Sequence, residues 1–188
     1  MKDCCPIILK PKNIILIGFM AAGKSSIGQL LARELNWDFL DTDTEIVNQT
    51  GLSIPEIFRK YGEARFRQEE SLLIQRLVNI NHTVIATGGG LVLNPDNWVT
   101  LQRLGMLIHL YVPLELALQR VKKRSERPLL ARPEEELSKL WLERLAIYNK
   151  ASVTFDTSGK NPEAIVAEIS AYLKGDHCHV TTNKCWRF

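Results

Sequence analysis

Residues 18–25 read Gly-Phe-Met-Ala-Ala-Gly-Lys-Ser and match the pattern G-x-x-x-x-G-K-[ST] at every fixed position. The run Ile14-Ile15-Leu16-Ile17 stands before it and has the uninterrupted apolar character of a strand buried on both faces of a parallel sheet. Apolar residues at helical spacing follow it, and Asn36 marks the expected end of that helix. This order of strand, glycine loop and helix predicts an α/β fold with a phosphate-binding loop.

A glycine loop of this kind holds a triphosphate because its backbone N–H groups converge on the anion without a bulky side chain between them. The following helix start adds partial positive charge, and Lys24 can reach the β- and γ-phosphates. The Ser25 hydroxyl can bind Mg²⁺. The alternative is a glycine-rich turn that contains a lysine by chance, and the flanking strand and helix argue against it. We expect nucleotide to bind Gly18, Ala21, Ala22, Gly23, Lys24, Ser25 and Ser26.

Length and composition favour a single α/β domain in a reduced setting. The chain has 188 residues and a dispersed net charge of +3, which gives no reason to expect a nucleic acid partner. Its four cysteines stand near the termini and do not form a disulfide framework. No run of 18 apolar residues predicts a membrane span, so we expect a cytoplasmic protein. The predicted parts are a lead-in over 1–12, a domain over 13–174 and a disordered tail over 175–188.

Two acidic residues follow the second predicted strand. Residues 37–40 read Trp-Asp-Phe-Leu, and Asp41-Thr42-Asp43 comes at the carboxyl end, where parallel sheets bind ligands. In an extended segment both carboxylates would point the same way, toward Mg²⁺ or a substrate hydroxyl. Alternatively Asp43 caps a helix and Asp41 is a solvated loop residue. The Asp-x-Asp pattern alone leaves these alternatives open.

The next segment predicts helices and then a third strand. Ser53, Pro55 and Glu56 have the pattern of a helix start, and Gly62 interrupts the helix. In the longer helix that follows, Arg67 can meet Glu70, although sequence alone favours a solvated face with surface ion pairs. The third strand, Thr83 to Thr87, ends in Gly88-Gly89-Gly90. These glycines predict either a close approach to the backbone, as by a second ligand, or a flexible turn.

The remaining strands are expected over 106–112 and 153–156, with a helix after each. Between them lies the basic segment 122–133, bounded by Pro128 and Pro133, whose composition suits a lid over phosphates. A solvated basic helix end is the alternative, and the phosphate loop makes the lid the better interpretation. A strongly periodic helix over 134–150 follows the segment.

Taken together, these motifs resemble the shikimate kinases, and the resemblance covers residues 13–174. It implies a P-loop NTPase fold, in which a five-stranded parallel sheet of order 2-3-1-4-5 has helices on both faces. It also implies transfer of the γ-phosphoryl group of ATP to the 3-hydroxyl of shikimate. We expect the protein to act as a monomer, without a nucleic acid or membrane partner. Its specificity comes from a combination of motifs: the loop 18–25, Asp41-Thr42-Asp43, Gly62-Glu63, Phe66-Arg67, Glu70, Gly88-Gly89-Gly90, Arg127-Pro128-Leu129-Leu130, Arg144 and Tyr148.

The resemblance assigns roles at the acceptor side of the site. It implies that Asp41, with Ser25, helps to hold Mg²⁺ and that Asp43 contacts the shikimate hydroxyls, where it orients or deprotonates the attacking one. It also implies that Arg67 and Arg144 grip the substrate carboxylate. In the family the triple glycine, here Gly88, Gly89 and Gly90, lies against the shikimate ring.

At the nucleotide side, the resemblance implies that the lid residue Arg127 reaches the ATP phosphates and that Arg120 packs against adenine. A loop near the fifth strand covers the other side of the base in the family. Here that loop, 157–160, lacks the usual arginine and offers Lys160 as a nucleotide contact. The tail from Gly175 onward matches nothing in the family pattern.

Two other functions remain open from the sequence. One is a kinase of another small hydroxylated metabolite, such as gluconate, or of a nucleotide. The other is a nucleotide-dependent switch or binding module without metabolic turnover. The acidic pair, the two separated arginines and the triple glycine favour a hydroxylated carboxylate as the acceptor.

Overall fold

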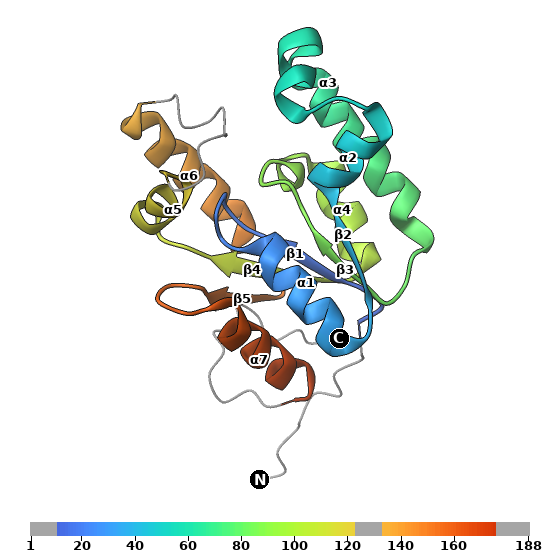
Figure 1. The fold of residues 1–188 in the computed structure, drawn as a ribbon, viewed down its shortest axis with the longest axis vertical. Coiled ribbons are helices and arrows are strands. Elements are labelled where there is room, and N and C mark those ends of the chain that lie inside the picture. The colour runs from blue at the N-terminus through green and yellow to red at the C-terminus, as the bar shows by residue number, and fades with distance from the viewer. Residues whose placement is uncertain (1–10, 123–132, 176–188) are drawn as a thin grey trace.

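The computed structural model describes residues 11–122 and 133–175, whose fold is shown in Figure 1. A parallel sheet forms its centre, with the strand order β2-β3-β1-β4-β5. This confirms the predicted fold and strand order. The strands are β1 (Ile14–Ile17), β2 (Asp38–Asp41), β3 (Thr83–Ala86), β4 (Met106–Tyr111) and β5 (Val153–Asp156).

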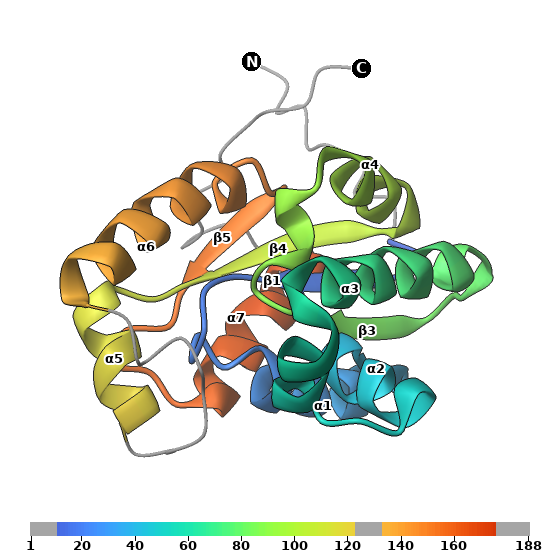
Figure 2. The ribbon, with the colours of Figure 1, turned by 90° about the horizontal axis from the view of Figure 1, so that it is seen from above.

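Helices cover both faces of this sheet. Viewed from above, α1 and α7 lie on one face, and α4 and α6 lie on the other (Figure 2). No helix in the described part of the chain is both long and apolar enough to cross a membrane. The helices are α1 (Lys24–Leu35), α2 (Thr42–Thr50), α3 (Ile54–Arg76), α4 (Pro95–Leu104), α5 (Leu114–Lys122), α6 (Glu134–Tyr148) and α7 (Pro162–Leu173), and short 3₁₀ turns span Leu77–Asn79 and Leu91–Leu93.

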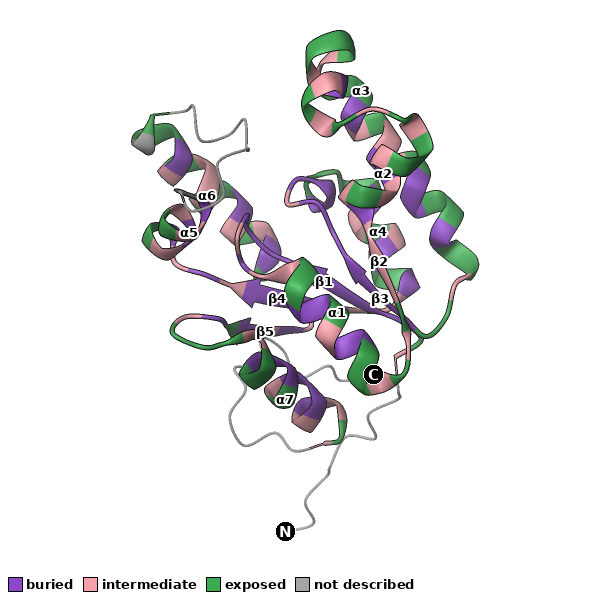
Figure 3. Ribbon diagram, viewed as in Figure 1, coloured by how far each residue is buried: buried purple, intermediate pink, exposed green. Residues whose placement is uncertain are grey.

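The core lies along the central strand. Each residue of β1 is fully buried, because β3 and β4 pair with its two edges while helices cover its two faces. Figure 3 shows this as continuous purple along the inner strands, with the exposed residues on the outward sides of the helices. Because neither face of this strand contacts water, consecutive residues 14–17 are all apolar rather than alternating with polar ones.

Helix α1 begins directly after the phosphate loop, as predicted. Gly23 stands at its N-cap with φ of 91°, and Asn36 ends it in the left-handed conformation with φ of 55°. Ile27 and Leu31 are buried on its inner face. The loop is therefore fixed between a buried strand and a packed helix, and its backbone amides are held in place on a rigid frame.

Helix α3 carries a break at Gly62, which also confirms an expectation. Its start has the predicted capping arrangement, in which Glu56 Oε2 accepts hydrogen bonds from Ser53 N (2.9 Å) and Ser53 Oγ (2.7 Å). Gly62 has φ of 79° and ψ of 173°, a conformation essentially restricted to glycine. The helix changes direction there, before it reaches Arg67.

The described structure differs from the expectation at the second strand, which is shifted by one residue. Trp37 N donates to Ala32 O (2.8 Å) and so belongs to the end of α1 rather than to a strand. The strand consequently runs through Asp41. The lead-in over 1–10, the part of the predicted lid over 123–132, including Arg127, and the tail over 176–188 lie outside the described residues.

Candidate active site

The site forms at the carboxyl ends of the strands, which parallel pairing places along one edge of the sheet. Gly18 follows β1, Asp41 ends β2 and Gly88 comes two residues after β3. Thr157 directly follows β5 at the same edge. Helices α2 and α3 stand on one side of this edge and α5 and α6 on the other (Figure 1).

The phosphate loop is compact and closed by its own lysine. Lys24 Nζ donates to Gly18 O (2.8 Å) and to Phe19 O (2.9 Å), so the ammonium lies over the loop. Gly18 has φ of 147°, and a Cβ there would overlap Leu110 O of β4. The first glycine of the motif is therefore needed because the loop passes directly against the neighbouring strand.

The acidic pair does not lie in an extended segment, which corrects one of the expectations. Asp41 is the N-cap of α2: its Oδ1 accepts from Asp43 N (3.0 Å) and Thr44 N (3.3 Å). Its Oδ2 accepts from Ser25 Oγ (2.6 Å). Asp43, predicted as a possible cap, instead lies inside the first turn of the helix. Thus the two carboxylates face different neighbours, Asp41 the phosphate loop and Asp43 the glycine turn.

The donor set around Ser25 and Asp41 suits Mg²⁺ bound together with a nucleotide. Within the described residues no group of three or more histidine, cysteine and acidic side chains gathers as a metal site of its own. Mg²⁺, however, is usually held by one or two protein oxygens while phosphates and water supply the rest. A hydroxyl and a carboxylate oxygen at hydrogen-bond distance, beside the phosphate loop, fit that pattern.

A pocket of about 340 Å³ opens beside the loop, large enough for part of a nucleotide. Arg120 spans it: Nη1 donates to Ala21 O (3.1 Å) and Nη2 to Thr157 O (2.8 Å). Lys160 also lines it, and its ammonium is paired with Glu168 (2.7 Å). The lining residues are Ala21, Ala22, Gly23, Ser26, Ile27, Arg120, Val121, Thr157, Lys160, Pro162 and Ile165.

The three glycines after β3 each leave room for a different side chain of the site. A Cβ on Gly88 would lie 2.6 Å from an Asp43 carboxylate oxygen, and one on Gly90 would overlap the Arg67 guanidinium. A Cβ on Gly89 would lie 3.3 Å from Arg144 Nη1. Three predicted site residues, from α2, α3 and α6, are thus brought together around one short turn.

This turn is tied to the acidic segment by a residue that sequence reasoning missed. Gly88 N donates to Thr42 Oγ1 at 2.9 Å, and Thr42 is fully buried. Thr42 stands between Asp41 and Asp43 in the sequence, and this position could have marked it as a residue of the site. Its hydrogen bond fixes the distance between Asp43 and the turn.

Arg67 is held in place by two carboxylates. Its Nη2 donates to Glu63 Oε1 (2.7 Å) and its Nη1 to Glu70 Oε2 (2.8 Å). The expectation of a solvated face is wrong for Glu70, which is fully buried. Burial raises the pKa of Glu70 to about 7, the Arg67 charge opposes this, and the charge of Asp43 adds to it. Glu70 Oε1 makes no hydrogen bond among the described residues.

Arg144 approaches the turn from the other side and is itself buried, with 5% of its surface exposed. Its guanidinium carbon lies 5.7 Å from the ring centroid of Phe19 in the phosphate loop. Its Nε makes no hydrogen bond within the part of the chain that is described. A buried guanidinium with a free N–H is suited to bind a carboxylate, since such a group rarely stays unpaired.

The glycine turn meets the phosphate loop at Gly89, where a Cβ would lie 3.6 Å from Gly18 O. On one side of this contact are backbone amides, Lys24 and a pocket. On the other side are one carboxylate that can accept a proton from a hydroxyl and two guanidinium groups that can bind an anion. The arrangement fits transfer of a phosphoryl group to a hydroxylated, negatively charged acceptor.

The comparisons with known proteins agree with this geometry. The sequence model of the shikimate kinase family matches residues 20–174. A shikimate kinase from Geobacter sulfurreducens is 43% identical over 165 residues, covering 87% of this chain and 91% of that protein. The solved structure of a shikimate kinase from Acinetobacter baumannii in complex with shikimate has a TM-score of 0.83 at 36% identity, covering 89% of this chain and 96% of that one.

A gluconokinase from Sinorhizobium meliloti also matches, with a TM-score of 0.58 at 18% identity over 88% of this chain and 93% of that one. Similarity at that level of identity concerns the fold alone. It adds nothing in favour of gluconate as the acceptor.

Proposed function

This chain belongs to the shikimate kinase family, whose members transfer phosphate to a hydroxyl group of shikimate, and we propose that it uses ATP to phosphorylate the 3-hydroxyl. The products are shikimate 3-phosphate and ADP, in the route to aromatic amino acids. The observation that carries the proposal is the convergence of Asp43, Arg67 and Arg144 on the Gly88–Gly90 turn, next to the phosphate loop.

Asp43 orients the attacking hydroxyl and takes its proton. As the new bond forms between the 3-oxygen and the γ-phosphorus, the bond from the γ-phosphorus to the β,γ-bridging oxygen breaks, and ADP leaves with that electron pair. The proton of the hydroxyl passes to a carboxylate oxygen of Asp43. This chemistry asks the protein for positioning and charge more than for covalent participation. The place of Asp43, against Gly88 in the first turn of α2, supports this role.

Arg67 and Arg144 bind the carboxylate of the acceptor. Their guanidinium groups reach the turn from α3 and α6, Arg67 at Gly90 and Arg144 at Gly89. Two forks of hydrogen-bond donors hold a planar carboxylate in one orientation, and this orientation decides which hydroxyl faces Asp43. Gly88, Gly89 and Gly90 leave the main chain open for a small, flat ring to lie close to it.

On the donor side, the phosphates lie over the loop from Gly18 to Ser26, with Lys24 on the β- and γ-phosphates. Arg120 and Lys160 contact the base from the pocket beside the loop. Arg127, outside the described residues, reaches the phosphates from the lid over 122–133. Ser25 and Asp41 would hold Mg²⁺, which supplies positive charge to the phosphate oxygens when bound.

We further infer a single domain over 13–174 that works as a monomer in the cytoplasm. The match to one family model over residues 20–174 supports the single domain, and the grouping of the cysteines at the chain ends supports a reducing compartment. Light scattering on the eluting peak of a size-exclusion column tests the monomer directly.

A coupled assay of ADP release tests the proposed function. We expect ADP release to depend on shikimate and on Mg²⁺, and to stay at background with gluconate or a nucleoside monophosphate as acceptor. Turnover with gluconate but without shikimate would point to the other class of metabolite kinase. Slow ADP release that no acceptor accelerates would indicate a nucleotide-dependent switch. A Lys24→Ala variant should lower kcat about a hundredfold, which shows that the signal comes from this site.

A further inference from the structure

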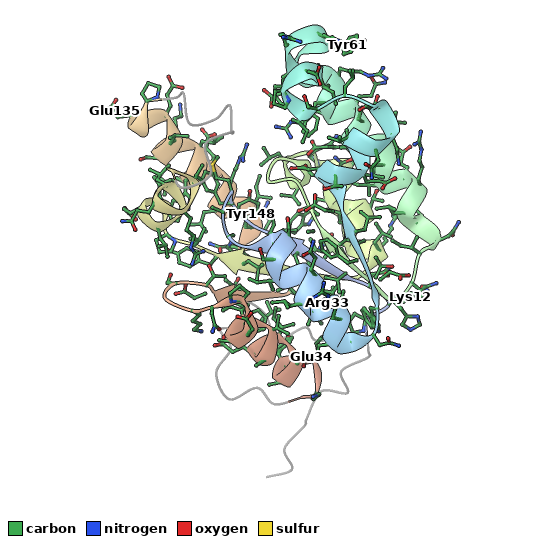
Figure 4. The ribbon with its side chains drawn as sticks, viewed as in Figure 1. Lys12, Arg33, Glu34, Tyr61, Glu135 and Tyr148 are labelled. Carbon is green, nitrogen blue, oxygen red and sulfur yellow. The ribbon has the colours of Figure 1, made fainter. Side chains whose placement is uncertain are left out.

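Tyr148 has no role in the function described so far, although it lies at the centre of the site. It is the last residue of α6 and only 1% of its surface is exposed. Figure 4 shows it near the middle of the molecule, whereas Tyr61 and Glu135 lie at the outer parts of their helices. Its ring packs against His109 of β4, with 5.3 Å between the ring centroids.

The hydroxyl of Tyr148 has two partners in the acceptor side of the site. It donates a hydrogen bond to Gly89 O at 2.6 Å. It also interacts with the guanidinium of Arg144, one helical turn earlier on α6. Burial raises the pKa of Tyr148 to about 12, and the charges of Arg144 and Arg67 oppose that rise. The phenol therefore stays protonated at any physiological pH and keeps its hydrogen bond to Gly89.

The chemistry of the Gly89 carbonyl, the Tyr148 hydroxyl and the Arg144 guanidinium fixes the direction of the hydrogen bonds between them. A carbonyl oxygen only accepts and a guanidinium only donates, so the hydroxyl proton goes to Gly89 and the oxygen of Tyr148 faces Arg144. A phenylalanine would fill the same space against His109. The hydroxyl is consequently not needed to fill the core, and its buried position requires another explanation.

We propose that Tyr148 is a positioning residue of the acceptor site, whose hydroxyl holds the Gly89 carbonyl and the Arg144 guanidinium at a fixed separation. Arg144 then presents its remaining N–H groups, including the buried Nε, to the carboxylate of the acceptor. Gly89 also lies against Gly18 O, so the same clamp sets the position of the turn relative to the phosphate loop. The inference rests on the proposed function, because it assumes a carboxylate at Arg144.

Tyr148→Phe tests the proposal by steady-state kinetics. We expect KM for shikimate to rise about tenfold, KM for ATP to stay within a factor of two, and kcat to change less than KM for shikimate. The matched control is Tyr111→Phe: its ring also packs against His109, 6.2 Å between centroids, and it belongs to β4 rather than α6. That control should leave both KM values unchanged.

A second measurement separates positioning of Arg144 from a general structural effect. The acceptor is replaced by the analogue in which the shikimate carboxylate is a carboxamide, which no longer pairs with Arg144 as an anion. Wild type should bind the analogue more weakly than shikimate. With the analogue as acceptor, Tyr148→Phe should raise KM less than twofold relative to wild type. An equal loss with both acceptors would mean that Tyr148 does not act through the carboxylate, and would overturn the proposal.

The remaining outcomes are also decisive. If Tyr148→Phe keeps the wild-type KM for shikimate, the hydroxyl does not position the site. If the variant loses its cooperative thermal unfolding, the hydroxyl is required for folding and the positioning role is wrong. Failure of the proposed function looks different, because wild type itself would then show no shikimate-dependent turnover.

Discussion

At the level of single residues, Gly88, Gly89 and Gly90 matter to the site because they lack a side chain, and not because of their backbone conformation. None of Gly88, Gly89 and Gly90 has a φ between +20° and +160°, the region that favours glycine. Each makes room for a different side chain, so the chain's own carboxylate and guanidinium groups occupy the space that a Cβ would take. The three glycines therefore allow charged side chains to pack around one short turn. A turn that served only as a flexible linker would not need this space.

Arg67 gives the first prediction at this scale. Arg67→Lys should raise KM for shikimate about tenfold, because a lysine cannot offer the two-pronged donor that a carboxylate accepts and that Glu63 and Glu70 hold in place. KM for ATP should barely change. The matched control is Arg65→Lys on the same helix, whose half-exposed side chain pairs with Glu69. A variant that loses affinity for ATP and keeps its affinity for shikimate would show that the acceptor binds elsewhere.

Glu70 gives a prediction for stability. Its pKa in the folded protein, about 7, lies above the ordinary value of 4.5, so the folded state favours the protonated form. Its contribution to stability is therefore complete below pH 4.5 and is lost as the pH rises through about 7. Glu70→Gln keeps the shape of the protonated form and removes this dependence.

The measurement is the difference in unfolding free energy between wild type and Glu70→Gln at pH 5 and at pH 8. Wild type should lose roughly 2 kcal/mol relative to the variant over this range, since each pKa unit corresponds to about 1.4 kcal/mol. The two proteins share every other titrating group, so the difference isolates Glu70. A difference that is constant with pH, or that favours wild type at pH 8, contradicts the assignment.

Lys24 and Glu70 differ in how well the sequence alone could predict their place in the site. The place of Lys24 over the phosphate loop was predictable, because it follows from local spacing within the eight residues of the loop. Glu70 was not, because its burial depends on Gly88, which is distant in the sequence and reaches it only through the folded sheet. For the same reason, the fold and strand order followed from local patterns and family resemblance. The hydrogen bonds of Thr42, Thr157 and Tyr148 join residues far apart in the sequence and could not be predicted in that way.

At the scale of secondary-structure elements, the kink in α3 decides where Arg67 lies. Gly62 has a φ of 79° and a ψ of 173°, and a Cβ there would meet nothing within 4 Å. The glycine is therefore required by the backbone conformation and not by crowding, the opposite of the triple glycine. The break separates the exposed tip of the helix from the part that carries Arg67 and Glu70.

Gly62→Ala should destabilise the protein by about 1–3 kcal/mol, the usual cost of a side chain in this region of φ and ψ. KM for shikimate should rise as well, because relief of the strain by straightening α3 would move Arg67 away from Gly90. Gly51→Asn is the control: Gly51 ends α2 with φ of 67° and ψ of 11°, a left-handed conformation that asparagine tolerates. Urea unfolding of the two variants measures the loss of stability, and steady-state kinetics measure KM for shikimate. If Gly62→Ala were as stable as wild type, the backbone at Gly62 would not require glycine.

At the scale of the whole molecule, the two proposed binding sites share one edge of the sheet and meet at the phosphate loop, where Gly89 lies next to Gly18 and Arg144 lies over the Phe19 ring. The pocket proposed for the nucleotide lies between α1, α5 and the loop after β5, whereas the proposed acceptor site lies between α2, α3 and α6. Damage to the outer part of one site should therefore leave binding at the other intact.

Ligand-induced stabilisation measures this separation. A ligand that binds only the folded state stabilises it by RT ln(1 + [L]/Kd), so a tenfold weaker Kd lowers the gain by about 1.4 kcal/mol at saturating ligand. Arg120→Gln removes the bridge between Ala21 and Thr157, and should reduce the rise in Tm caused by ADP by about 3–5 °C. The rise caused by shikimate should stay the same, because Arg120 lies outside the acceptor site. Arg67→Lys should give the reverse pattern, and Arg103→Gln, on the exposed side of α4, should change neither. Equal loss of both shifts in Arg120→Gln would mean that the two sites form one coupled unit, which contradicts their separation.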